Sequence, residues 1–330
     1  MEPPMIMRLL ASSVACGNLA CKIIRDTLTK GNLSIIDKGV NDFQTLADRN
    51  SQRSIIQSLN AAYPTLKVIG EEGILDSQDI EICSTQDPSV LAMQCPDKYK
   101  DVSLQDTFVW VDPIDGTNEF TQGLVHHVTV LIGISVKGKA VGGVICQPFY
   151  REGDLEDVTK IKIGPEGSDE IEKTKIRTIW GLDGLGVHGD IFNKRKPLTR
   201  PSFAKNGQNI IVTTRSHPTK ISNDTIQACS PSQVARIGGC GFKVLALIDN
   251  LAHAYVFASP GCKKWDTCAP EGILRAAKGQ LTDIMGNEYD YSEKAVHMNK
   301  NGVLATADMS WHQEYISRIP ESVKIELSKT

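Results

Sequence analysis

The hexapeptide Asp112-Pro113-Ile114-Asp115-Gly116-Thr117 is the segment of this sequence with the clearest chemical meaning. It follows the apolar run Phe108–Val111, which predicts a buried strand ending at Asp112. Two carboxylates this close repel each other unless a cation or protons neutralise them. Hard oxygen ligands on a tight turn suit Mg²⁺, with the Ile114 carbonyl as a candidate extra ligand. Two aspartates alone are more often solvated turn residues, but the whole hexapeptide after a strand favours a magnesium site.

Two other motifs that contain aspartates and a glycine do not fit this segment. A calcium-binding EF-hand loop needs ligands at alternate positions and a distant glutamate, and Pro113 breaks that register. Phosphatases that form an aspartyl-phosphate use Asp-x-Asp-Gly-Thr, and here Pro113 stands where the first aspartate belongs. We therefore expect no nucleophilic aspartate.

Three further segments supply acidic residues. Glu71 and Glu72 follow a short predicted strand, Asp42 and Asp48 fall on a predicted helix, and Asp266 begins a later helix. Singly, each has an ordinary explanation, such as a solvated strand end or a first-turn acid favoured by the helix dipole. Together they bring acids from distant parts of the chain, as a phosphoryl-transfer site with several metal ions requires.

In these motifs the chain resembles the lithium-sensitive, magnesium-dependent phosphatases, a family that includes inositol monophosphatase, fructose-1,6-bisphosphatase and 3′(2′),5′-bisphosphate nucleotidase. The family combines an aspartate-bearing helix, Gly-Glu-Glu, Asp-Pro-(Ile/Leu)-Asp-Gly-Thr and a late Trp-Asp, and all four occur here in that order. The similarity to the nucleotidase branch covers nearly the whole chain. It includes Val111–Thr117, Val128–Ile134, Arg177–Gly181, Thr213–His217 and Ala258–Pro270.

The resemblance implies an α+β fold, a layered αβαβα sugar-phosphatase arrangement with mixed sheets packed between helices. We expect an N-terminal subdomain, 1–180, with most metal ligands, and a C-terminal subdomain, 181–330, with the nucleotide contacts, joined in one compact unit. The implied activity is Mg²⁺-dependent removal of the 3′-phosphate from adenosine 3′,5′-bisphosphate, giving AMP, by a water that the metal activates. The sulfated analogue and, as a side activity, inositol 1,4-bisphosphate are further expected substrates, which suggests a role in sulfur metabolism.

The resemblance also implies residue roles. Two or three Mg²⁺ ions would be held by Glu71, Asp112, the Ile114 carbonyl, Asp115 and Asp266. Asp48 and Thr117 would activate the attacking water. The nucleotide would be contacted by Gly116, Thr117, Thr214, His217, Gly239, Lys243 and Asp266. One departure concerns these contacts, because Phe242 precedes Lys243 where the family pattern favours a small polar residue.

Two other functions compete with this interpretation. An inositol phosphate phosphatase would share the metal site, but Thr-Thr-Arg-Ser-His at 213–217 and Gly-Gly-Cys-Gly-Phe-Lys at 238–243 favour a nucleotide. A catalytically dead relative could serve as a metal-binding scaffold, but the intact acids and Thr117 argue against it.

Composition limits the class of protein. The chain has 330 residues, 41% hydrophobic and 23% charged, which is typical of a folded globular protein. A net charge of −3 argues against a broad nucleic-acid-binding face. Nine cysteines without a CxxC pair favour free thiols in a reducing compartment. We therefore expect a cytoplasmic protein without nucleic-acid or membrane partners, and the resemblance implies a small nucleotide as its substrate. The sequence does not identify protein partners.

The elements that must position these residues follow from periodicity. Helical spacing from Met5 to Ile23 predicts an amphipathic helix ending near Gly31, in preference to a signal peptide. A second helix is predicted over 42–62, capped by Asn41 or Asp42. The longest apolar run, Val128–Val136, is too short to span a bilayer as a helix. It pairs with 140–147 in a predicted hairpin, and residues 151–175 are expected to form a surface loop.

Overall fold

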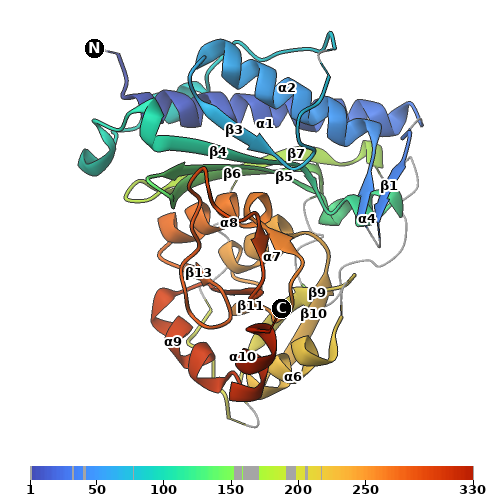
Figure 1. Cartoon of the computed structure of the whole chain (residues 1–330), viewed down its shortest axis with the longest axis vertical. Coiled ribbons are helices and arrows are strands. Elements are labelled where there is room, and N and C mark those ends of the chain that lie inside the picture. Colours follow the sequence, from blue (N-terminus) through green and yellow to red (C-terminus); the bar gives the residue numbers. More distant parts are fainter. Residues whose placement is uncertain are drawn as a thin grey trace.

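The computed structural model describes residues 2–31, 33–39, 42–76, 78–151, 158, 171–190, 198–204, 207–216 and 218–329. The described elements stack in five layers of helices and sheets in alternation (Figure 1). This confirms the predicted α+β fold with mixed sheets between helices. Most of the predicted loop at 151–175 lies outside the described residues.

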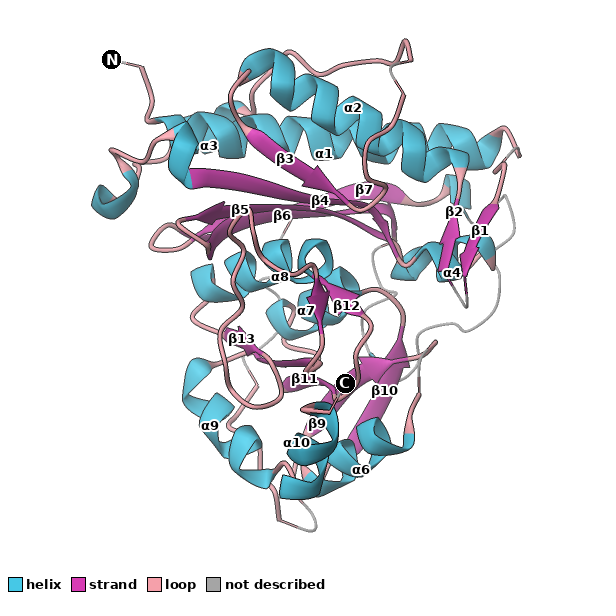
Figure 2. Cartoon of the chain, viewed as in Figure 1, coloured by secondary structure: helices cyan, strands magenta, loops and turns pink. Residues whose placement is uncertain are grey.

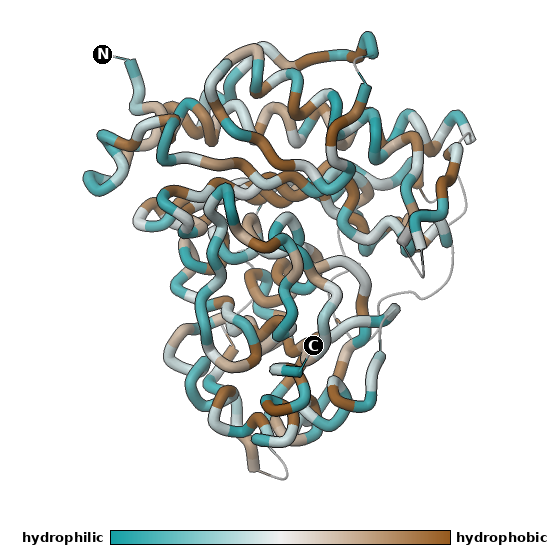
Figure 3. Tube along the Cα trace, in the orientation of Figure 1, coloured by the Kyte–Doolittle hydropathy of each residue, from teal (hydrophilic) through white to brown (hydrophobic). Residues whose placement is uncertain are grey.

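Two long helices, α1 (Met5–Thr29) and α2 (Leu46–Ala62), cover one face of the larger sheet (Figure 2). The helix α1 ends close to the predicted position. By length and composition, it is the one helix in the described ranges that could cross a membrane, and 72% of its apolar window is buried inside the fold. Its buried side chains pack with those of the sheet in one core cluster. The hydropathy colouring in Figure 3 shows that the strands of this sheet are largely hydrophobic.

The larger sheet has six strands in the order β3-β4-β5-β6-β7-β8. Strand β3 runs parallel to β4, and the other neighbours are antiparallel. The predicted hairpin is β5–β6, and β7 crosses the expected division at residue 180, so residues as far as Gly189 belong to this sheet. The strands are β3 (Lys67–Gly70), β4 (Thr107–Asp115), β5 (Thr129–Val136), β6 (Lys139–Tyr150), β7 (Lys175–Leu182) and β8 (Gly186–Gly189).

Helices α7 (Cys240–Ile248) and α8 (Lys264–Ala276) fill the layer between the two sheets. The second sheet has the order β10-β9-β11-β15-β13 and is also mixed. It comprises β9 (Ile210–Thr214), β10 (Gln233–Ile237), β11 (Ala254–Phe257), β13 (Gln280–Thr282) and β15 (Val303–Thr306). Its outer face carries α6 (Lys220–Ala228), α9 (Met309–Arg318) and α10 (Glu321–Leu327). Short elements are α3 (Pro88–Leu91), α4 (Thr117–Thr121), β12 (Cys262–Lys263) and β14 (Met298–Asn299).

The predicted start of the second helix is wrong. Residues Asp42–Gln44 form strand β2, which pairs antiparallel with β1 (Ile36–Gly39), and the helix begins at Leu46. Asp42 therefore lies in a hairpin and does not share the helix with Asp48.

The N-cap of α2 is Thr45. Its hydroxyl accepts hydrogen bonds from the amides of Ala47 and Asp48, and the Asp48 carboxylate accepts from the Thr45 amide at 2.7 Å. This capping box fixes the helix start, and it also holds Asp48 at the end of the helix nearest α4.

Candidate active site

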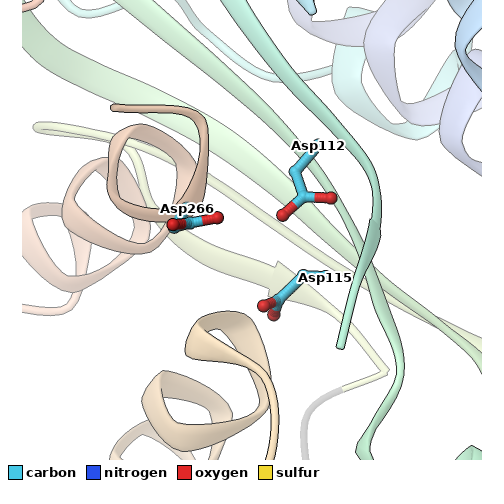
Figure 4. Close-up of side chains that lie close together, drawn as sticks. All are labelled: Asp112, Asp115 and Asp266. Atoms are coloured by element: carbon cyan, nitrogen blue, oxygen red, sulfur yellow. The ribbon is translucent and has the colours of Figure 1, made fainter. Parts of the chain in front are cut away.

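Three aspartates from two distant segments meet between the sheets. Asp112 and Asp115 lie at the end of β4, and Asp266 lies in the first turn of α8. One carboxylate oxygen of each lies within 4.8 Å of those of the other two, and the carboxylates point toward one another (Figure 4). The strand was predicted to end at Asp112, but β4 continues to Asp115. Residues three apart in a regular strand face opposite sides; a register shift between Asp112 and Asp115 brings both to the same site.

Glu71 joins this cluster from the neighbouring strand. Its backbone amide donates to the Val111 carbonyl at 3.0 Å, which extends the parallel pairing of β3 and β4 past Gly70. The carboxyl ends of two parallel strands therefore deliver Glu71 beside Asp112. Glu72 points elsewhere: both of its oxygens accept from Lys38 Nζ at 3.0 Å, and one also accepts from Gln44. Glu72 thereby ties the β1–β2 hairpin to this end of the sheet, a role that sequence reasoning missed.

Burial and the repulsion between neighbouring carboxylates disfavour the ionised forms of these acids. Burial, together with the charges of Asp266 and Glu72, raises the pKa of Glu71 to about 8. Burial and the charge of Asp115 raise the pKa of Asp266 to about 6, and burial followed by the charge of Glu71 raises the pKa of Asp112 well above its usual value. Crowded carboxylates of this kind are stabilised by a hard divalent cation. The residues present therefore fit the metal site predicted from the sequence.

Thr117 stands between the acid cluster and Asp48. It begins α4 after Gly116, whose φ of 95° favours glycine. The Thr117 hydroxyl lies 3.0 Å from Asp48 Oδ1 and 2.9 Å from the Ile114 carbonyl. A hydroxyl has one hydrogen to donate, so a cation on the Ile114 carbonyl would commit that hydrogen to Asp48. Burial raises the pKa of Asp48 to about 6, although the Thr45 hydrogen bond opposes the shift.

A pocket of ≈ 340 Å³ connects the acid cluster with the second sheet. Asp48 does not line the pocket, but it accepts a hydrogen bond from Thr117, which does. His217 lies outside the described residues. The structure brings the other predicted site residues together along its wall, and their individual roles stay predictions. They are Glu71, Asp112, Ile114, Asp115, Gly116, Thr117, Thr214, Gly239, Lys243 and Asp266.

Phe242 does not displace Lys243 from this pocket. Phe242 is buried and stacks on His127 with 5.5 Å between ring centroids. Lys243, the next residue of α7, lines the pocket, where its Nζ donates to the Gly239 carbonyl at 2.5 Å and lies 5.1 Å from the centre of the Tyr255 ring. Phe242, the residue that departs from the family pattern, therefore faces the hydrophobic core and not the pocket.

Several pocket residues were not found from the sequence. Glu119 is buried, burial raises its pKa, and its Oε1 lies 3.5 Å from Arg215 Nη1. Ser216 could have been found, because it belongs to the Thr-Thr-Arg-Ser-His segment. The aromatic and apolar members carry no local signal, because they come from separate elements. They are Phe43, Tyr255, Phe257 and Met298.

Comparisons with known proteins agree with this arrangement. The model of the inositol monophosphatase family matches residues 8–323. The 3′(2′),5′-bisphosphate nucleotidase 1 of Rattus norvegicus is 45% identical over 327 residues, covering 98% of this chain and 97% of that protein. The Homo sapiens protein of the same name is 45% identical over 323 residues, covering 97% and 96%.

Solved structures share the fold at lower identity. An inositol monophosphatase from Zymomonas mobilis has a TM-score of 0.61 and 19% identity, covering 95% of this chain and 97% of that one. Staphylococcal IMPase-II with 2′AMP bound has a TM-score of 0.62 and 17% identity, covering 95% of each. With a family model that spans almost the entire sequence and relatives that match it from end to end, the chain belongs to the inositol monophosphatase family.

Proposed function

We propose that this chain is a 3′(2′),5′-bisphosphate nucleotidase that hydrolyses the 3′-phosphate of adenosine 3′,5′-bisphosphate to give AMP and inorganic phosphate. The observation that carries the proposal is a single pocket in which the acid cluster adjoins aromatic side chains. The near full-length similarity to the rat and human nucleotidases supports the same substrate class. The sulfated analogue, 3′-phosphoadenosine 5′-phosphosulfate, presents the same 3′-phosphate and is a second substrate.

The pocket favours a nucleotide over an inositol phosphate. Phe43 offers a partly exposed aromatic surface on the wall beyond the acids, and Tyr255 and Phe257 line the same pocket as buried side chains. A purine base can pack its face on such surface, whereas an inositol ring is surrounded by hydroxyl groups that need hydrogen-bonding partners. Lys243 adds a positive charge suited to a second phosphate. Inositol 1,4-bisphosphate, which also has two phosphates, remains a side substrate.

The residues divide the work of hydrolysis. Glu71, Asp112, Asp115, Asp266 and the Ile114 carbonyl would hold two or three Mg²⁺ ions, which supply positive charge to the phosphate oxygens and the leaving oxygen when bound. Thr117 accepts a hydrogen bond from the attacking water while its own hydroxyl donates to Asp48. Asp48, with a pKa of about 6, is ionised at neutral pH and can receive the proton that passes through Thr117.

The cysteines support an intracellular site of action. All nine lie among the described residues, and all are free thiols, eight of them buried. Unpaired cysteines are typical of a reducing compartment, so the cytoplasm is the proposed location.

The test is to measure phosphate release from adenosine 3′,5′-bisphosphate and, in separate assays, from the alternative substrates inositol 1-phosphate and inositol 1,4-bisphosphate. We expect the nucleotide to give the highest kcat/KM, and we expect chelation of Mg²⁺ to abolish release from every substrate. Preference for inositol 1-phosphate would replace the nucleotide assignment with an inositol phosphate phosphatase. Failure to hydrolyse any of the three in Mg²⁺ would favour a metal-binding scaffold without catalysis.

A further inference from the structure

We propose that Thr129 is a positioning residue for the metal site. Together with two amides of α7, its hydroxyl fixes the Asp115 carboxylate so that one lone pair is left for one cation. The inference rests on the proposed function in one respect, namely that the cation bound by these acids is Mg²⁺.

Three donors converge on the Asp115 carboxylate. The Thr129 hydroxyl donates to Oδ2 at 2.6 Å, the Gly241 amide donates to Oδ2 at 2.7 Å, and the Cys240 amide donates to Oδ1 at 2.7 Å. An ionised carboxylate offers about four lone-pair sites. With both sites of Oδ2 and one of Oδ1 engaged, Asp115 can give a cation a single oxygen, Oδ1.

The other two aspartates are held less tightly by the backbone. Asp112 accepts one amide hydrogen bond, from Ile114 at 3.1 Å, and Asp266 accepts one, from Lys263 at 2.6 Å. Asp115 is therefore the acid whose direction the fold fixes most fully. Losing one of its three donors should alter cation binding more than losing a hydroxyl elsewhere in the same sheet.

The fold builds this arrangement from both sides of the site. Thr129 opens β5 directly opposite Asp115 on β4, just after the register shift, and its side chain is fully buried. The first turn of α7 comes from the layer below and approaches through Gly241. A Cβ at position 241 would lie 2.5 Å from the Thr129 hydroxyl oxygen and 3.1 Å from Asp115 Oδ2. Glycine is thus what allows the helix to close on both groups at once.

The expected consequence is a loss of cation affinity. Hydrogen bonds to a carboxylate stabilise its charged form and fix its direction, and both effects favour a bound cation. Removing partners that orient metal ligands typically lowers metal affinity by about 10–100-fold. A purely structural role for Thr129 would instead lower thermal stability and leave cation affinity unchanged.

The test compares three variants of the full chain. Thr129→Val keeps the shape and removes the hydroxyl, and Thr129→Ser keeps the hydroxyl. Thr107→Val is the matched control: Thr107 lies at the other end of the same strand pair, is equally buried, and donates its hydroxyl to the Ser103 carbonyl at 2.8 Å. Calorimetric titration of metal-free protein with Mg²⁺ gives the Kd without substrate, and the unfolding temperature reports the fold.

We expect Thr129→Val to raise the Mg²⁺ Kd about 10-fold or more, Thr129→Ser to restore it, and Thr107→Val to leave it at the wild-type value. Equal Kd values for the two valine variants, or no measurable Mg²⁺ binding by the wild-type chain, would overturn the proposal. Because this titration contains no nucleotide, its outcome is independent of the substrate assay. Mg²⁺ binding with the expected pattern but no nucleotide hydrolysis would contradict the proposed function and would leave the role of Thr129 supported.

Discussion

The hydroxyl of Thr117 lies 3.0 Å from Oδ1 of Asp48, a residue 69 positions earlier in the chain. The other oxygen of Asp48, Oδ2, accepts from the amide and the hydroxyl of Thr45 and closes the capping box of α2. Asp48 therefore has two roles: its Oδ2 completes the N-terminal cap of α2, and its Oδ1 contacts Thr117 at the pocket. The helix start fixes the direction of Oδ1 toward Thr117.

We expect Thr117→Ala to lower kcat by ~10²–10⁴-fold, the usual contribution of a positioned proton-transfer group, while KM changes little. Thr117→Ser keeps a hydroxyl at the start of α4 and should retain most of the activity. Steady-state kinetics at saturating Mg²⁺ measure both constants. A rise in KM with normal kcat would make Thr117 a substrate-binding residue and would remove Asp48 from the proton pathway.

Asp112→Asn should abolish hydrolysis and leave the fold intact. The remaining carbonyl oxygen can still accept from the Ile114 amide, but a neutral amide provides no charge for a cation. Since burial and the charge of Glu71 raise the pKa of Asp112, the substitution also relieves repulsion, so the unfolding temperature without metal should rise. Normal turnover at millimolar Mg²⁺ would contradict the metal assignment. Asp115→Asn is a poorer test, because its amide nitrogen would face the donors that hold Asp115.

Glu71 should make the metal-free protein less stable as the pH rises from 6.5 to about 8. The pKa of Glu71 is about 8 in the folded protein against 4.5 for an ordinary glutamate. In this range the native state keeps a proton that the unfolded chain has already released, so stability falls with increasing pH. The lowered pKa values of the buried His127, about 3, and His312, about 4, affect stability mainly below their ordinary value of 6.5. The Cys83 thiol acts in the opposite direction over this range, because its hydrogen bond with Cys16 lowers its pKa to about 5. The Glu71 contribution is therefore the difference between the wild type and a variant that cannot ionise at position 71.

The measurement is the unfolding temperature in chelator at several pH values. Glu71→Gln, which cannot ionise, should gain stability relative to the wild type as the pH rises, and saturating Mg²⁺ should remove this difference by stabilising the ionised carboxylate of the wild type. The same pH dependence in the metal-free wild type and in Glu71→Gln would contradict the assignment.

Local sequence patterns were sufficient to predict much of the fold. The periodicity of α1 and the β5–β6 hairpin are properties of contiguous residues, and both predictions are confirmed. The start of α2 was wrong because Asn41, Asp42 and Thr45 are all good N-cap residues. Pairing of β1 with β2 decides among them by placing Asp42 in a strand, and that pairing depends on the tertiary structure.

The site was predictable to the extent that its motifs are contiguous. The register shift that turns Asp112 and Asp115 to one side is set by pairing with β5, so the hexapeptide alone could not predict it. Thr129 and Gly241 are 14 and 126 positions from Asp115, and nothing in their own neighbourhoods marks them as its partners. Such contacts become visible only when the two sheets are placed together.

Lys243→Ala should raise KM for adenosine 3′,5′-bisphosphate and spare hydrolysis of a small generic phosphate ester. Lys243 Nζ lies on the pocket wall between the Gly239 carbonyl and the Tyr255 ring, where it can meet a phosphate that is not being cleaved. Lys220→Ala, which alters a lysine on the exposed face of α6, is the control for general charge effects. Equal losses on both substrates would point to damage of α7, and no loss on either would make Lys243 a bystander.

Lithium ions should inhibit this enzyme at concentrations that leave unrelated magnesium phosphatases active. Li⁺ is close to Mg²⁺ in size and carries half its charge, so it fits among carboxylate and phosphate oxygens and supplies a weaker field. Glu71, with 15% of its side chain exposed, marks the open edge of the acid cluster, where an ion could exchange while substrate or product is bound. We expect Li⁺ to trap the complex with product phosphate, which makes inhibition uncompetitive with substrate. Initial rates against substrate at several Li⁺ levels, with Na⁺ at matched ionic strength as control, should give parallel double-reciprocal lines. Lines that meet on the rate axis would place Li⁺ on the free enzyme, and rates indifferent to Li⁺ would separate this chain from the lithium-sensitive members of its family.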